Sequence, residues 1–237
     1  MQLTTSRTSN YHSQRVDLYP AHQRAIWRRK MTTTAIIGLG NMGKGIAKRL
    51  SGETNLVLSS RNAETAIAFA AALGNGAEVL DIDNAVQRAD VIILALPYEA
   101  AIEVAKHSGL SGKIVIDITN PVKPDFSGLT IGHTTSAAEE LQAIAPSAKI
   151  VKAYNTVFAS IFDLPAAQTA TVPVFLAGND HDAVSKVEAL VTASGFKAEK
   201  TGALDAARLI EPLAMLNIRF GYALGRGTSI APAWQDL

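Results

Sequence analysis

Three glycines with fixed spacing, Gly38, Gly40 and Gly43, follow the short apolar run at residues 35–37 and precede a segment of mixed apolar and basic residues. This G-x-G-x-x-G spacing, with a strand before it and a helix after it, is typical of a turn that binds a dinucleotide diphosphate. Gly38 makes the tight turn, Gly40 lets the backbone approach the diphosphate, and Gly43 lets the helix pack on the strand. The predicted nucleotide contacts in this turn are Gly38, Leu39, Gly40, Asn41, Met42 and Gly43.

The end of the next apolar run, residues 55–58, indicates which dinucleotide is bound. Sites for NAD usually place a carboxylate there to hold the ribose hydroxyls. This sequence instead has Ser59, Ser60, Arg61 and Asn62. A guanidinium binds a phosphate dianion bidentately, and hydroxyls add further donors. The sequence therefore predicts a 2′-phosphate site and NADP(H) as cofactor. The alternative is a capped helix start with an exposed Arg61, since Asn62 is also a plausible N-cap, and both interpretations can hold together.

Composition limits the remaining possibilities. The chain has 237 residues, 48% of them hydrophobic and 18% charged, which predicts one large domain or one domain with a small second one. A net charge of +1 gives no strong field toward nucleic acid or a membrane surface. The absence of cysteine excludes disulfides, thiolate catalysis and Cys-ligated metals, and favours a cytoplasmic location.

Residues 1–30 differ from the rest, because they are polar and rich in arginine, with Asp17 as the lone acid. Transit peptides share this composition. Met31 stands just before the first predicted strand, however, where a nucleotide-binding domain would begin. We favour an overlong start or a disordered N-terminal extension over a targeting segment, because residues 1–30 contain no apolar h-region.

From residue 33 onward, predicted strands and helices alternate, which indicates an α/β fold of the Rossmann type with a doubly wound parallel sheet. A nucleotide-binding domain is predicted at residues 31–157 and a small C-terminal α/β portion at residues 158–237. The expected strands are 35–37, 56–58, 78–80, 91–95, 113–117, 150–151, 172–177 and 196–200. The expected helices begin at residue 42 and span 63–73, 83–88, 98–107, 135–145 and 181–193.

The last helical pattern, residues 204–223, is interrupted by Pro212 and Gly221. Its apolar residues recur at three- and four-residue spacing, which predicts one buried stripe. Packing against the sheet is the default interpretation, and a dimer interface is the alternative. The stripe comprises Leu209, Leu213, Leu216 and Phe220.

Ligands of an open α/β sheet bind outside the carboxyl ends of its strands. Three strand-end loops should therefore surround the adenine-ribose and nicotinamide end of the cofactor, although Pro and Asn are also ordinary loop residues. The predicted contacts are Leu96, Pro97, Tyr98, Asn120, Pro121, Asn155 and Thr156.

No catalytic group or metal site can be assigned, because the five histidines are scattered through tail, helix and loops without metal-ligand spacing. Hydride transfer between a nicotinamide and a flavin-like ring requires alignment more than acid–base help, since the two cofactors carry the chemistry.

The sequence from about Thr34 onward resembles the NADPH-dependent deazaflavin (coenzyme F420) reductases. The resemblance rests on five segments, at residues 38–45, 58–61, 94–98, 152–156 and 202–211. It implies a C-terminal portion that closes over a deazaflavin cleft, and often a homodimer. It also implies that Ser59 and Arg61 grip the 2′-phosphate and that Leu96 and Pro97 flank the nicotinamide. Archaeal members have a histidine where this chain has Asn155, so the chain is more similar to bacterial members with mixed acceptors.

Three functions are compatible with these features. The first is an NADP(H)-dependent oxidoreductase that exchanges hydride with a planar small-molecule acceptor such as a deazaflavin or flavin. The second is a reductase of a small carbonyl or imine, whose known representatives add a long all-helical domain. The third is a redox sensor that binds NADP(H) without turnover, because binding does not imply catalysis.

Overall fold

The structure is a computed structural model that describes residues 31–235. The predicted N-terminal extension, residues 1–30, lies outside the described residues. In the described part of the chain, no helix is long and apolar enough to cross a membrane.

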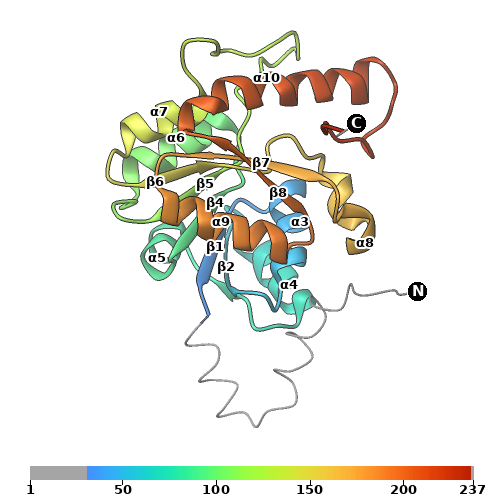
Figure 1. Cartoon of the computed structure of the whole chain (residues 1–237). Helices are drawn as coiled ribbons and strands as arrows, with labels where there is room; N and C mark the ends of the chain where they lie inside the picture. The colour runs from blue at the N-terminus through green and yellow to red at the C-terminus, as the bar shows by residue number, and fades with distance from the viewer. Residues whose placement is uncertain (1–30, 236–237) are drawn as a thin grey trace, which may run out of the picture.

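One eight-stranded sheet forms the centre of the molecule, with strand order β3-β2-β1-β4-β5-β6-β7-β8 (Figure 1). Strands β3 to β6 in this order are all parallel, as expected of a Rossmann-type sheet. The α/β prediction is confirmed. The strands are β1 (Thr33–Ile37), β2 (Asn55–Ser59), β3 (Glu78–Val79), β4 (Val91–Leu94), β5 (Ile114–Asp117), β6 (Lys149–Lys152), β7 (Pro173–Gly178) and β8 (Lys197–Gly202).

Helices follow most strands, and the bounds predicted for α6 and α9 agree with the structure. Asp180 is the N-cap of α9, because its carboxylate accepts a hydrogen bond from the Ala183 amide at 2.8 Å. The helices are α3 (Asn41–Leu50), α4 (Ala63–Leu73), α5 (Ile82–Arg88), α6 (Tyr98–His107), α7 (Ala137–Ile144), α8 (Ala166–Thr169), α9 (His181–Ala193) and α10 (Ala207–Ile218), with 3-10 turns η1 (Ala159–Asp163) and η2 (Leu204–Ala206) and a π-helical turn η3 (Arg219–Ala223).

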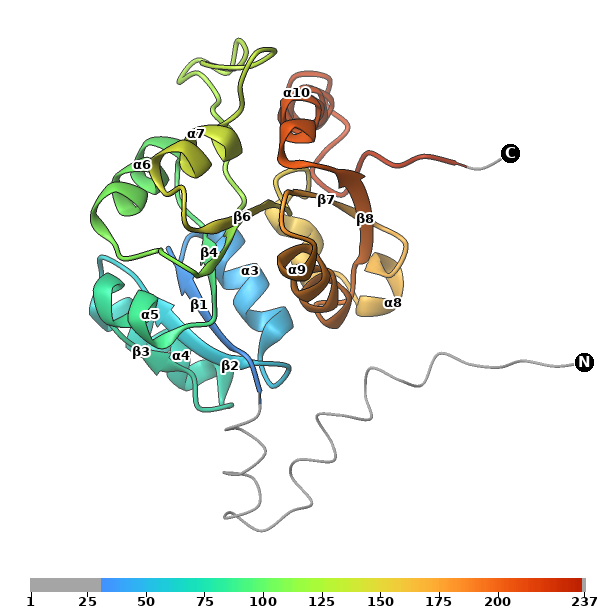
Figure 2. The same ribbon diagram turned by 60° about the vertical axis from the view of Figure 1, so that its left-hand side comes forward.

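The two faces of the sheet have separate hydrophobic cores, because successive side chains of a strand point to opposite faces. In β4, Ile93 belongs to the core beneath α3, α4 and α9, whereas Ile92 belongs to the core beneath α5, α6 and α7. Figure 2 shows α6 and α7 on one side of the sheet and α3 and α9 on the other. Both faces are covered, so the strands read as continuous apolar runs.

The sheet is not parallel throughout. Strand β7 pairs antiparallel with β6 through only two residue pairs, Val151 with Gly178 and Lys152 with Ala177. Strand β8 runs parallel to β7. Chain direction is set by how the connection between β6 and β7 returns to the sheet, and an apolar run has the same pattern in either direction. Strands β7 and β8, from the predicted C-terminal portion, thus continue the sheet begun by residues 31–157.

The predicted buried stripe of α10 is wrong for Leu209 and Leu216, whereas Leu213 and Phe220 are half-buried. Leu209 is 75% exposed and Leu216 is 48% exposed, whereas Glu211 and Asn217 are buried on the inward face together with small alanines. The inward face lies over buried polar groups at the ends of β5 and β6, so polar side chains are needed there. Pro212 lies inside α10 and does not end it.

Candidate functional site

The glycine-rich turn after β1 has the geometry that its sequence predicts. Gly38 adopts φ +99°, a left-handed conformation that favours glycine. A Cβ on Gly43 would lie 1.9 Å from the carbonyl oxygen of Gly38, so α3 can approach the turn only because Gly43 lacks one. A Cβ on Gly40 would meet nothing within 4 Å. Gly40 is also the N-cap of α3 and no side chain caps this helix, which leaves room and backbone donors for a diphosphate.

The contrast between these glycines predicts two different defects. In Gly40→Ala, we expect an unchanged melting temperature and an NADPH dissociation constant raised by about tenfold, ~1.4 kcal/mol, because the methyl group fills only the ligand's space. In Gly43→Ala, overpacking against Gly38 should destabilise the fold by about 1–3 kcal/mol. Calorimetric titration and thermal unfolding of both variants measure these effects. Loss of stability in Gly40→Ala would contradict the assignment.

The end of β2 lies beside this turn, since the Gly38 amide donates to the carbonyl of Ser59 at 2.9 Å. Ser59 is only 1% exposed and its Oγ has no hydrogen-bond partner. Asn62 caps α4 by accepting from the Thr65 amide at 2.9 Å, so its capping role is confirmed. Arg61 is exposed. Ser59 and Arg61 fit the 2′-phosphate of NADP, because they offer donors with no carboxylate in the segment.

A cavity of about 430 Å³ opens next to the glycine-rich turn. It brings together eight of the predicted residues, Gly40, Asn41, Met42, Leu96, Pro97, Asn120, Asn155 and Thr156. The sequence did not predict the other lining residues, which are Ala95, Ile118, Thr119, Phe126, Val157, Phe158, Ala159, Ala214, Asn217, Ile218 and Tyr222. Several of these come from η1, α10 and η3, whose approach to the turn depends on the tertiary fold.

The remaining predicted residues lie outside this lining. Gly38 and Leu39 belong to the turn itself, and Gly43 lies in the first turn of α3. The two serines, Arg61 and Asn62 lie between the end of β2 and the start of α4. The hydroxyl of Tyr98 donates to Glu140 of α7, and burial raises the pKa of Tyr98. The carbonyl of Pro121 accepts from the Thr130 amide at 2.7 Å.

Two asparagines from neighbouring strand-end loops interlock at the cavity. Asn155 Nδ2 donates to Asn120 Oδ1 at 2.9 Å, and Asn120 Nδ2 donates to the Asn155 carbonyl at 2.8 Å. Asn155 Nδ2 also reaches the carbonyl oxygen of Ile210 in α10, at 3.4 Å. The pair therefore connects the loops after β5 and β6 with the C-terminal helix.

The residue before Asn155 holds an unusual backbone conformation. Tyr154 has φ +57° and is fully buried. Left-handed conformations cost a large non-glycine residue about 1–3 kcal/mol and persist where the surroundings enforce them. Here the ring packs edge-on against Phe196, with centroids 6.3 Å apart, and the hydroxyl lies 3.0 Å from Ser194 Oγ. Tyr154 thereby turns the chain sharply at the end of β6, where Asn155 enters the cavity wall.

A buried ionic cluster supports these loops from below. Lys152 Nζ lies 2.7 Å from Asp117 Oδ2 and 2.7 Å from Glu211 Oε1, and all three side chains are at most 1% exposed. Lys152 also donates to the Thr119 carbonyl at 2.7 Å, while Asp117 Oδ1 accepts from the Thr119 amide at 2.8 Å. Glu211 accepts from the Ala137 amide at the start of α7. Burial raises the pKa of Glu211, and Lys152 opposes this shift. The cluster fixes both sides of Thr119, which lines the cavity.

The chain is similar to known proteins over most of its length. The family model for NADP oxidoreductases that depend on coenzyme F420 matches residues 33–121. The F420-dependent NADP reductase of Methanocaldococcus jannaschii is 30% identical over 214 residues, which cover 81% of this chain and 94% of that protein. The chain belongs to this family. It is an NADP-dependent oxidoreductase.

Solved structures agree with this membership. A protein of Arthrobacter sp. FB24, described as a candidate F420-dependent NADP reductase, aligns with a TM-score of 0.72 at 26% identity, covering 84% of this chain and 96% of that one. An imine reductase of Aspergillus terreus aligns with a TM-score of 0.61 at 21% identity, covering 82% of this chain and 63% of that one. The latter likeness concerns the fold alone.

In this member of the family, a bidentate ion pair ties α10 to α7. Arg208 Nε lies 2.8 Å and Nη2 2.5 Å from the two carboxylate oxygens of Glu139. The hydrogen bond from Arg208 lowers the pKa of Glu139 below its ordinary 4.5, and the Ser136 hydroxyl adds to the effect. A carboxylate with a lowered folded-state pKa stabilises the fold above its ordinary pKa, and this contribution is lost as the pH falls through the folded value.

Arg208→Met should therefore melt below the wild type at pH 7, and the difference should shrink as the pH falls below about 4.5. Thermal unfolding of both proteins between pH 3 and pH 8 measures this. The matched control is Arg226→Met, because Arg226 lies over the Phe220 ring at 5.5 Å. Any change in its melting temperature should therefore not depend on the titration of Glu139. A difference that stays constant down to pH 3 would rule out the proposed linkage.

Proposed function

We propose that this oxidoreductase transfers hydride between NADP(H) and a planar tricyclic acceptor, a deazaflavin of the coenzyme F420 type. The observation that carries the proposal is the composition of the cavity. The glycine-rich turn forms one side, and the aromatic side chains of Phe126, Phe158 and Tyr222 lie among the other lining residues. Phe158 and Tyr222 stack edge-to-face with centroids 5.7 Å apart, which suits a flat ring system.

The proposed roles of the lining residues follow from their positions. NADPH supplies the hydride when it is bound. Gly40, Asn41 and Met42 would hold the diphosphate, Ser59, Ser60 and Arg61 the 2′-phosphate, and Leu96 and Pro97 one side of the nicotinamide. Residues 158–237 would close the acceptor side, because Phe158 and Tyr222 come from this portion. Aromatic walls that align two rings provide what hydride transfer needs most.

Reduction of a small imine or carbonyl is the second candidate. Such a substrate needs a proton for its nitrogen or oxygen. Among the described residues that line the cavity, the phenol of Tyr222 is the ionisable group, and it is 68% exposed. A side chain so exposed does not shield the proton transfer from water, so we rank this function second.

A steady-state screen separates the candidates. NADPH oxidation is followed with an 8-hydroxy-5-deazaflavin, riboflavin phosphate, a ferric chelate, a cyclic imine and a small ketone. We expect the deazaflavin to give a kcat/KM at least tenfold above the others, and Tyr222→Phe to retain most of this activity. Faster turnover of the imine or ketone, abolished in Tyr222→Phe, would overturn the proposal. Tight NADPH binding with no oxidation would favour a redox sensor.

We further propose that two copies associate through the outward face of α10, on which Leu209 and Leu216 are exposed to solvent. An exposed apolar stripe on a helix commonly marks an interaction surface. Light scattering should give a dimer for the wild type and a monomer for Leu209→Lys combined with Leu216→Lys, with the circular dichroism spectrum unchanged. A monomeric wild type would refute this association. The exposed Ile67 on α4 offers a matched control, Ile67→Lys, which should remain dimeric.

A further inference from the structure

Four buried side-chain atoms among the described residues have no hydrogen-bond partner: Ser59 Oγ, Thr119 Oγ1, Asn155 Oδ1 and Thr156 Oγ1. Leaving a buried polar atom unpaired costs about 1–3 kcal/mol, so an unpaired atom at a binding site indicates a hydrogen bond to a ligand. Ser59 lies at the end of β2, where the 2′-phosphate is expected. The other three belong to residues that line the cavity. The unpaired atoms thus mark the two ends of the expected dinucleotide.

The orientation of the Asn155 amide is determined by its neighbours. Its nitrogen lies near the side-chain oxygen of Asn120 and the carbonyl oxygen of Ile210, at 2.9 and 3.4 Å. Both of these oxygens only accept hydrogen bonds. Asn155 must therefore direct Nδ2 toward them, which leaves Oδ1 as an acceptor in need of a donor. Asn155 is 7% exposed, so bulk water does not satisfy this oxygen.

The neighbouring hydroxyls have complementary chemistry. Thr119 and Thr156 are each 2% exposed, and a hydroxyl can donate to a carbonyl oxygen. One free acceptor and two free hydroxyl donors, all on residues that line the same cavity, match a primary carboxamide, which offers N–H donors and one carbonyl oxygen. The ionic cluster holds Thr119 from both sides of its backbone, and the left-handed Tyr154 precedes Asn155. The three groups are thus placed on a rigid support.

We infer that Asn155 Oδ1 accepts a hydrogen bond from the carboxamide nitrogen of the nicotinamide, and that the hydroxyls of Thr119 and Thr156 donate to its carbonyl oxygen. This assignment rests on the proposed function and deepens it by naming what reads the nicotinamide end. A site built to bind an N–H group discriminates against an analogue that lacks it, because the buried acceptor is then left unpaired. Asn155 is accordingly a specificity-determining residue of the cofactor site.

The test uses the 3-acetylpyridine analogue of NADP⁺, in which a methyl group replaces the carboxamide NH₂ and the carbonyl is retained. Wild-type protein should bind NADP⁺ about tenfold more tightly than the analogue in calorimetric titration. In Asn155→Leu the two dissociation constants should agree within about twofold. In Thr156→Val both nucleotides should bind more weakly by the same factor, so the ratio of the wild type should persist. The control Asn84→Leu, an exposed asparagine on α5, should behave as wild type.

Two further measurements keep the outcomes distinct. Melting temperatures identify a variant that fails to fold. If Asn155→Leu fails to fold, Thr156→Val tests the inference in its place. The fragment adenosine 2′,5′-bisphosphate lacks the nicotinamide and should bind wild type and all folded variants alike. If it does not bind the wild type, the proposed NADP site itself is wrong. If the fragment binds and Asn155→Leu keeps the wild-type ratio of the two dissociation constants, the carboxamide assignment is overturned. In that case, a KM raised for the acceptor alone would show that Asn155 contacts the acceptor.

Discussion

Arg61→Asp is expected to shift the preference between NADPH and NADH by roughly 10²- to 10³-fold toward NADH. The substitution removes a charge-assisted contact to the 2′-phosphate, worth about 1.5–3 kcal/mol, and adds a carboxylate that repels a phosphate but can accept from ribose hydroxyls. Ser59, buried with an unpaired Oγ beside the turn, is the neighbouring donor that we propose for wild type. Fluorescence titration with both reduced nucleotides gives the ratio of dissociation constants.

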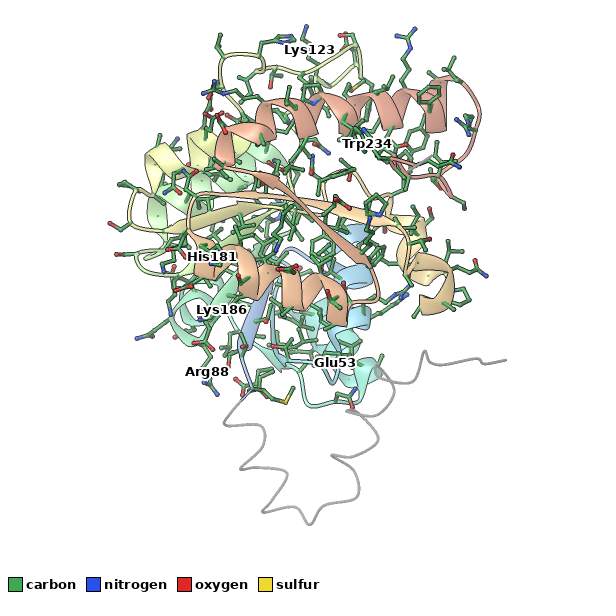
Figure 3. All side chains as sticks on the ribbon, in the orientation of Figure 1. Glu53, Arg88, Lys123, His181, Lys186 and Trp234 are labelled. Carbon is green, nitrogen blue, oxygen red and sulfur yellow. The ribbon has the colours of Figure 1, made fainter. Side chains whose placement is uncertain are left out.

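A matched control is available on α5. Arg88, labelled in Figure 3, is an exposed arginine at the end of this helix. It lies just before the start of β4, whereas the glycine-rich turn follows the carboxyl end of β1. Arg88→Asp should leave the nucleotide preference as in wild type. If Arg61→Asp also leaves it unchanged, the 2′-phosphate is bound elsewhere and the proposed pocket is misplaced.

The second large effect concerns the buried ionic cluster. Lys152→Met should lower the free energy of unfolding by about 3–5 kcal/mol, because it leaves Asp117 and Glu211 buried without a compensating charge. Replacing all three groups by neutral ones, Lys152→Met with Asp117→Asn and Glu211→Gln, should recover much of this loss. Chemical denaturation of the single and triple variants measures both values.

Lys149 on the same strand provides the comparison. It pairs with Asp180 at 2.9 Å, but its side chain is 41% exposed, so Lys149→Met should change stability little. Equal stability of Lys152→Met and wild type would show that the cluster does not support the fold. A triple variant no more stable than Lys152→Met would show that the loss comes from packing rather than from unpaired charge.

Local sequence patterns were sufficient for much of the fold. The glycine spacing after β1 predicted three properties that the structure has. Gly38 makes the tight turn, Gly43 allows the helix to approach closely, and Gly40 leaves open space. The fully apolar run of β4 predicted a strand buried on both faces. These features depend on backbone geometry and on burial within one or two neighbouring elements, which nearby residues determine.

The failures arose where distant segments meet. Helical spacing of apolar residues in α10 predicted a buried stripe, but the helix turns Glu211 and Asn217 inward because Lys152 and the carbonyl of Thr156 lie beneath it. No periodicity encodes an ionic partner 59 residues earlier in the chain (211 − 152). The available signal was Lys152, which follows the apolar pair Ile150 and Val151 in β6, since a buried cation requires a buried carboxylate.

Contacts between segments far apart in the sequence also limit how much of the site can be predicted. Residues at strand ends were found from topology, because parallel strands bring their carboxyl ends to one edge. Phe158, Asn217 and Tyr222 were missed, since their approach depends on how the antiparallel β7 returns the chain across the sheet. Trp234, which packs edge-on against Phe175 of β7, belongs to the same late segment (Figure 3).

The hydrophobic core beneath α3 and α9 is continuous across the junction of β6 and β7. Leu50 of α3 belongs to the same cluster as Phe162 and Val187, and Arg49 donates to the carbonyl of Phe162 at 2.8 Å. The segment that we propose to contact the acceptor therefore cannot be exchanged as an independent unit. A chimera that imports this segment from a relative must import the matching surface of α3 as well, so divergence in acceptor choice within such enzymes should proceed by point substitutions around the cavity rather than by recombination.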